Sequence, residues 1–107
     1  GLNQNLEGEA MCTTFSVGNP CPSSATSTVP ENNQRFGTSS AAYSSGFPLS
    51  STTPQLLQLK VPKTSSTTNP SQGVTYWGIG VPIEITLSGA YTGLNTFYGV
   101  ISSSTDW

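Results

Sequence analysis

The chain has the length of one domain and carries only eight charged residues among 107, with no histidine. Three basic residues cannot form the phosphate-binding patch that duplex nucleic acid needs, and no stretch approaches the ~20 apolar residues of a transmembrane helix. Serine and threonine together number 32, and this uncharged composition indicates a β-rich structural or binding protein rather than an enzyme.

The N-terminal third predicts one strand followed by a turn between two cysteines. Residues 1–9 are polar and predict a linker, or a strand donated to another chain. Glu9–Val17 alternates side chains as a half-buried strand does, and residues 18–20 predict the turn after it. Cys12 and Cys21 flank this turn. Because there is no histidine to complete a zinc site, a local disulfide is favoured, which implies a location outside the cytosol; two buried free thiols are the alternative.

The middle of the chain predicts several short strands separated by Gly, Pro and Ser. The candidates are Thr26–Val29, Gln34–Gly37 and Ala41–Ser45, followed by Phe47-Pro48-Leu49 as an anchor of the connecting loop to the core. Gln55–Val61 alternates more clearly, and Pro62 either ends it or makes it an edge strand. Residues 63–73 are polar and low in complexity, which predicts an exposed loop.

Val74–Val81 is the strongest strand candidate of the sequence. Gly78 and Gly80 share one of its faces, which predicts a bulge or a close neighbour there. Residues 83–87 are apolar at alternate positions, so we expect them to pack as a short strand or an irregular crossover, with Glu84 pointing outward. Ala90–Ser102 is expected to form the last strand or hairpin arm, and residues 103–107 a tail.

About six to eight short strands in one chain of this length are typical of an immunoglobulin-like (Ig-like) antiparallel β-sandwich. We therefore predict that residues 1–107 form a single all-β domain of this type. A jelly roll or a small barrel would have similar elements, and both stay open as alternatives.

Two motifs carry a resemblance to a known group of proteins. Tyr76-Trp77-Gly78-Ile79-Gly80-Val81-Pro82, followed by Gly89-Ala90-Tyr91-Thr92-Gly93, resembles a pattern of bacterial secreted and pilin-associated surface proteins. In that group a Y-W-x-I-x-V-P strand and a G-x-Y-x-G turn lead to the final strand, and the resemblance extends over residues 34–102. It implies an Ig-like sandwich with a structural role at the cell surface and no catalytic residues.

The sequence predicts no catalytic residue, metal site or cofactor. Its serines have no histidine to act as a base, and residues 78–80 lack the third glycine of a dinucleotide-binding loop. The carboxylates stand in no glycosidase or calcium-binding motif. They are Glu7, Glu9, Glu31, Glu84 and Asp106.

Aromatic side chains of the C-terminal third are the candidate binding or interface residues. They are Tyr76, Trp77, Tyr91, Tyr98 and Trp107. Exposed, they would stack on sugar rings or contact another protein; buried, Trp77 and Tyr91 would fill the core together with Phe97. Val74–Val81 carries no charge, and an uncharged strand edge invites pairing with another chain.

These observations predict a non-enzymatic extracellular or cell-surface protein. The function favoured is a structural subunit of a pilus-like filament or surface assembly, with copies of itself or other surface subunits as partners. One alternative is a carbohydrate-binding or adhesive module that uses exposed aromatics to bind glycans. Another is a viral capsid or fibre subunit, because small β domains of this kind have a similar composition.

Overall fold

The computed structural model describes residues 1–107 and consists of eight strands in three antiparallel sheets, one short α-helix and two 3-10 turns. The prediction of an all-β chain is confirmed. The α-helix has four residues, and none of the helices has the length and apolar character needed to cross a membrane.

The first sheet, here the β1 sheet, has β1 (Leu2–Gly8) at its centre, between β6 (Gln55–Val61) and β8 (Asn95–Ile101). Of the two alternatives predicted for residues 1–9, the linker is wrong over Leu2–Gly8, because this segment is a strand. It is not donated to another chain but pairs with two strands of its own. Leu6 explains this placement, because its side chain is completely buried in the core.

The second sheet, here the β4 sheet, places β4 (Gln34–Gly37) between β5 (Phe47–Pro48) and β7 (Tyr76–Ile79). A third, minimal sheet joins β2 (Met11–Cys12) to β3 (Thr28–Val29). The bounds of β4 and β6 are those predicted from the sequence. β7 occupies only the middle of its predicted range, and β8 only the C-terminal part of its own.

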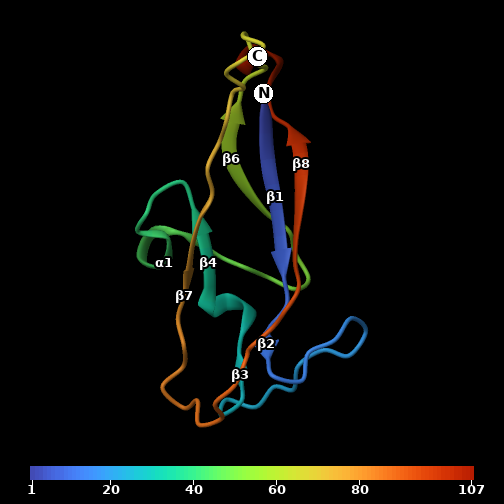
Figure 1. Cartoon of the computed structure of the whole chain (residues 1–107), viewed down its shortest axis with the longest axis vertical. Coiled ribbons are helices and arrows are strands. Elements are labelled where there is room, and N and C mark those ends of the chain that lie inside the picture. Colours follow the sequence, from blue (N-terminus) through green and yellow to red (C-terminus); the bar gives the residue numbers. More distant parts are fainter.

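A small core lies between the two three-stranded sheets. It consists of Leu6, Leu57, Phe36 and Leu49, with Leu59 packed against it. Of the predicted anchor Phe47-Pro48-Leu49 only Leu49 is buried; Phe47 and Pro48 form β5 and are exposed. Figure 1 shows the β1 sheet extending toward the chain termini beyond the level of β4 and β7, so the two sheets cover each other only in part.

The segment that leads into β7 crosses the β1 sheet. Gly73 lies against the side chains of Leu59 and Val61 in β6, and the Thr75 hydroxyl donates a hydrogen bond of 2.6 Å to Gln4 Oε1 in β1. Two residues on, the Trp77 ring meets Phe97 of β8, edge to face, with centroids 5.5 Å apart. This path brings β7 opposite β8.

The predicted strand over Ala41–Ser45 is wrong, because α1 (Ala42–Ser45) is helical. The hydroxyls of Ser44 and Ser45 both donate to the Ala41 carbonyl, at 3.2 and 2.8 Å, and the Ser45 N–H donates to the same oxygen. Serine hydroxyls can bond to nearby backbone in this way, and the resulting turn competes with an extended strand.

Tyr43 of α1 is the close neighbour predicted for Gly78 in β7 and Gly80 just after it. A Cβ added at Gly78 would lie 2.7 Å from Tyr43 Cβ, and one added at Gly80 would overlap the Tyr43 hydroxyl. The Arg35 guanidinium lies over the Tyr43 ring at 4.4 Å and donates to the Tyr43 carbonyl at 3.0 Å. The helix is thus held on the outer face of the β4 sheet.

Two other predicted strands are shorter or absent. Within Glu9–Val17 only Met11–Cys12 is a strand, and residues 13–14 turn directly after it. A second turn follows, closed by the Asn19 N–H donating to the Ser16 carbonyl. Residues 83–87 form no strand, and the expectation that they pack is wrong for Ile83, which is 94% exposed. Glu84 is exposed, as expected.

The tail predicted over residues 103–107 is ordered by the 3-10 turn η2 (Ser104–Asp106), and a second such turn, η1 (Glu31–Asn33), precedes β4. Ser103 and Asp106 form a capping box. The Ser102 hydroxyl donates to Asp106 Oδ2 and, with the Ser103 N–H, lowers the pKa of that carboxyl. Figure 1 shows the two termini side by side.

We predict that Phe36→Ala removes a large part of the stability. Deleting a buried aromatic ring costs about 3–5 kcal/mol, against about 5–15 kcal/mol of total stability for a typical domain. Urea unfolding followed by circular dichroism measures the loss. The matched control is Leu56→Ala in β6, whose side chain is 47% exposed and should cost about 1 kcal/mol or less. Equal effects of the two substitutions would contradict the assigned core.

Candidate functional site

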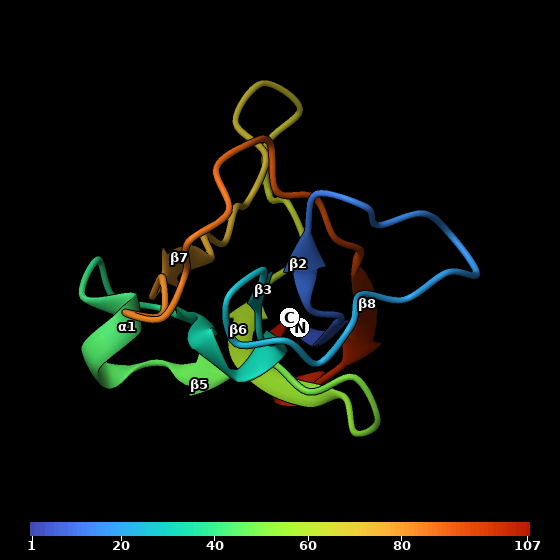
Figure 2. The same cartoon turned by 90° about the horizontal axis from the view of Figure 1, so that it is seen from below.

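Cys12 and Cys21 form the predicted disulfide, with their Cα atoms 5.8 Å apart. The bridge ties β2 to the end of the intervening loop, and Cys12 itself is buried. Figure 2 shows this loop projecting away from the rest of the chain. Val17 within it is 84% exposed. The bond is compatible with an extracellular location.

Reduction of this disulfide should lower the free energy of unfolding by about 2–3 kcal/mol, because the bridge closes a loop of ~10 residues in the unfolded chain. The double variant Cys12→Ser with Cys21→Ser should show a similar loss in chemical denaturation. Intact-mass measurement after alkylation provides the check on the bond. Two alkylated thiols in unreduced, native protein would disprove the bridge.

The predicted aromatic residues do not form one row. Trp77 is 37% exposed and packs between Phe36 and Phe97, with ring centroids 5.8 and 5.5 Å away. Tyr76 is 41% exposed and, as its neighbour in β7, points to the opposite face. Trp77 therefore belongs partly to the core and partly to the surface.

The other three aromatics lie in separate places. Tyr98 is on the face of β8 opposite Phe97, Trp107 follows η2 at the terminal end of the molecule, and the Tyr91 hydroxyl donates to the Leu87 carbonyl. The Tyr98 hydroxyl donates a hydrogen bond of 2.7 Å to Glu7 Oε1 on the neighbouring strand. This bond, desolvation and the carboxylate charge together raise the pKa of Tyr98.

We predict that Tyr98 ionises above the ordinary tyrosine pKa of about 10. The bond to Glu7 stabilises the protonated hydroxyl, so its contribution to stability is present below pH ~10 and is lost as the pH rises through the raised pKa. Ultraviolet titration of the protein against the Glu7→Gln variant isolates this group. The variant should ionise at lower pH than the parent; identical titration curves would contradict the pairing.

Sequence reasoning missed the aliphatic part of the exposed surface. Ile79, Val81 and Ile101 are 54%, 67% and 76% exposed, and the sequence did not single them out as surface residues. Beside Trp77 and Ile79 a hollow of about 190 Å³ opens, and Asn95 Oδ1 is buried next to it without a hydrogen-bond partner. Alternation identifies the apolar face of a strand but not whether the same chain supplies its cover.

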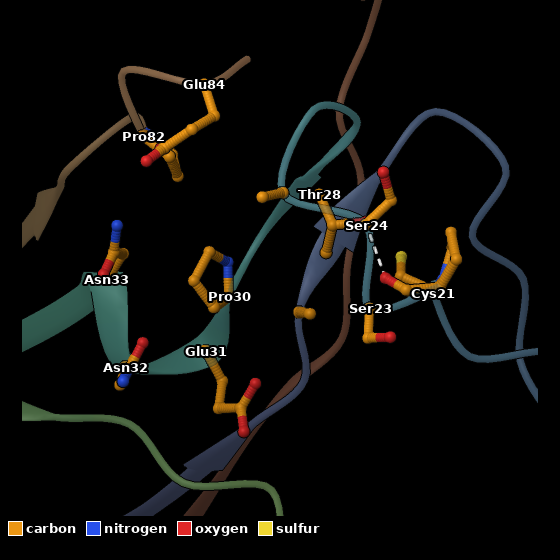
Figure 3. Close-up of a pocket in the computed structure, with 13 residues that line it drawn as sticks. Cys21, Ser23, Ser24, Thr28, Pro30, Glu31, Asn32, Asn33, Pro82 and Glu84 are labelled. Atoms are coloured by element: carbon orange, nitrogen blue, oxygen red, sulfur yellow. Dashed lines mark hydrogen bonds between the residues drawn. The ribbon is translucent and has the colours of Figure 1, made fainter.

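The largest cleft, of about 580 Å³, lies at the end of the molecule opposite the two termini. It is lined by residues at the end of the disulfide-bonded loop, by η1, and by Pro82 and Glu84. Figure 3 shows Pro82 and Glu84 on one side and Cys21, Ser23 and Ser24 on the other. The Thr28 hydroxyl donates to the Pro22 carbonyl at 2.7 Å, the dashed line in Figure 3.

The residues that line the cleft are mostly polar residues and prolines. Glu31 and Glu84 are its two carboxylates, and Asn33, which lines it as well, donates its amide to the Gly80 carbonyl. No group of three or more Cys, Asp or Glu side chains is gathered here or elsewhere as metal ligands would be. None of the aromatic candidates lines this recess, so it offers no stacking platform for a sugar ring.

Comparisons with known proteins find no match for this chain among protein-family models, curated proteins or solved structures.

Proposed function

We propose that this chain is a non-enzymatic structural subunit of an extracellular assembly, such as a pilus-like filament or a cell-surface layer, in which neighbouring subunits cover its exposed apolar side chains. The observation that carries the proposal is the excess of accessible surface over that of a self-contained domain of equal mass.

The excess can be put in numbers. The chain exposes 6630 Å² at a mass of 11.2 kDa. A folded monomer of this mass exposes about 5,700 Å², so the surplus is about 900 Å². A standard protein interface buries about 800 Å² on each partner. The surplus is therefore of the size that one interface with another subunit would remove.

The shape and the hydrogen bonds agree with this interpretation. The radius of gyration is 16.2 Å, whereas a compact domain of this length has about 13 Å. The chain makes 39 backbone–backbone hydrogen bonds, fewer than the about 70 expected for its length. Backbone groups at open sheet edges and apolar side chains at open faces are the groups that another subunit would pair and cover.

The two facing sheets also support the proposed Ig-like class. The Y-W-x-I-x-V-P motif lies in and after β7, and residues 89–93 lead to β8, which is the order that the resemblance implies. The disulfide and the low charge support an extracellular location. The cell-surface role and the pilin-like relationship are inferred from this combination.

The carbohydrate-binding alternative has less support. A sugar platform needs aromatic rings on one accessible face beside polar side chains. Here Tyr76 and Tyr98 lie on different sheets, Trp77 packs against Phe36 and Phe97, and the largest cleft lacks aromatic rings. A viral capsid or fibre subunit would also need neighbouring subunits to cover its apolar surface. It differs from the main proposal only in that the assembly would belong to a virus.

Electron microscopy and sedimentation velocity of the oxidised protein test the proposal. We expect particles larger than the 11.2 kDa chain, increasing with concentration, and regular filaments or layers in native material. A glycan array should give no specific binding. A protein that stays monomeric at all concentrations and binds a defined glycan would overturn the proposal in favour of the adhesive module.

A further inference from the structure

The open strand edges of this chain differ in how well they are protected. At the edge of the β1 sheet, β6 carries Lys60, which has a left-handed φ of 51° where the β1–β6 register shifts, and Pro62 follows. At the edge of the β4 sheet, β5 is two residues long and contains Pro48. A charge, a bulge, a proline or a short length each hinders edge-to-edge pairing.

The edge of β7 is uncharged but short. It has four residues, α1 packs on its outer face through Tyr43, and Pro82 lies three residues beyond its end. The sequence alone singled out Val74–Val81 as the uncharged edge. The structure reduces the paired part of that segment to Tyr76–Ile79, which offers few backbone groups to a partner.

The edge of β8 has none of these protections. Asn95–Ile101 is seven residues long, contains no charge and no proline, and pairs with β1 in unbroken register from Leu2 to Gly8. Its other side has no neighbouring strand. Phe97 and Ile101 on this strand are 51% and 76% exposed. Such an edge is a template for an added strand.

The order of side chains in β8 indicates which strand fits. If a second β8 lies antiparallel about a two-fold axis at Tyr98, all seven residues pair, and Phe97 of each copy lies opposite Gly99 of the other. A Cβ added at Gly99 would meet no atom within 4 Å, so the space beside Gly99 is open. A cross-strand aromatic ring over a glycine stabilises such an edge.

We propose that β8 is a self-pairing edge through which two copies of this chain join their β1 sheets into one continuous six-stranded sheet, centred on Tyr98. This rests on the proposed function and names the first contact of the assembly. Self-pairing brings no like charges together along the strand, because β8 has none; Glu7, on the next strand, is the nearest charged side chain bonded to it. Trp77 covers part of each Phe97 ring, and the partner strand would cover part of the half that its own chain leaves exposed.

Disulfide trapping tests the register of the pair. Thr96 and Val100 lie opposite each other in the proposed pairing, so a mixture of Thr96→Cys and Val100→Cys chains should form a mixed cross-linked dimer in preference to either symmetric one. Tyr98→Cys should cross-link with itself. Leu56→Cys, on the exposed face of the protected β6, is the control and should give little dimer. Peptide mapping assigns each bond. The pairing would be overturned if the mixed dimer and the Tyr98→Cys dimer formed in no greater yield than the symmetric dimers and the Leu56→Cys dimer.

A second variant tests the contact without new cysteines. Gly99→Lys fits the open space in the monomer, so circular dichroism in dilute solution should remain that of the parent. In the pair it fills the place of the partner's Phe97 and brings two positive charges together, which should weaken association about tenfold or more. Gln58→Lys in β6 is the matched control and should associate as the parent does.

The outcomes separate this inference from the proposed function. If Gly99→Lys associates as strongly as the parent, the β8 pairing is overturned and self-association through another surface remains. If the parent itself stays monomeric in sedimentation equilibrium at all concentrations, both the pairing and the self-associating subunit are overturned. Loss of association in Gly99→Lys but not in Gln58→Lys supports pairing through the β8 edge.

Discussion

The packing of the two main sheets on each other depends on Phe36. Its completely buried ring packs with Leu6 and Leu57 of the β1 sheet and meets the Trp77 ring of its own sheet at 5.8 Å. Only seven hydrophobic residues of the whole chain are buried, so little else holds the sheets in place. Burial is the dominant favourable term in folding, and a core this small leaves a narrow margin over the entropy of the ordered chain.

The limits of the core account for the rest of the surface. Apolar side chains that would enlarge the core instead lie open at β8, in β7 and along residues 81–87. A self-pairing edge at β8 would join copies in twos. The second open region, which contains Val81 and Ile83, lies on a different segment, and a contact there would let such pairs extend into a longer assembly.

The sequence was a good guide where short-range patterns decide the structure. Alternation and flanking prolines or glycines set the bounds of β4 and β6, and the spacing of Cys12 and Cys21 fits the observed bridge. Gly78 and Gly80 indicated a bulge or a close neighbour, but that this neighbour is Tyr43 depends on a contact between distant segments that no local pattern encodes.

Sequence reasoning failed where distant partners decide. Leu2–Gly8 reads as a polar linker because its apolar side chains are few, yet pairing on both sides makes it the central strand of its sheet. The apolar alternation of residues 83–87 predicted packing, but no segment of the chain covers Ile83. The aromatic candidates could be found by composition, whereas their distribution over separate faces follows from the fold alone.

The thermal unfolding midpoint of the oxidised protein as a function of protein concentration tests most directly whether other copies complete this core. If they do, the midpoint rises with concentration, because association stabilises the folded state over the unfolded chain. A cooperative transition with the same midpoint in the most dilute and the most concentrated sample would contradict this, since it would mean that the small core between the two sheets is sufficient by itself.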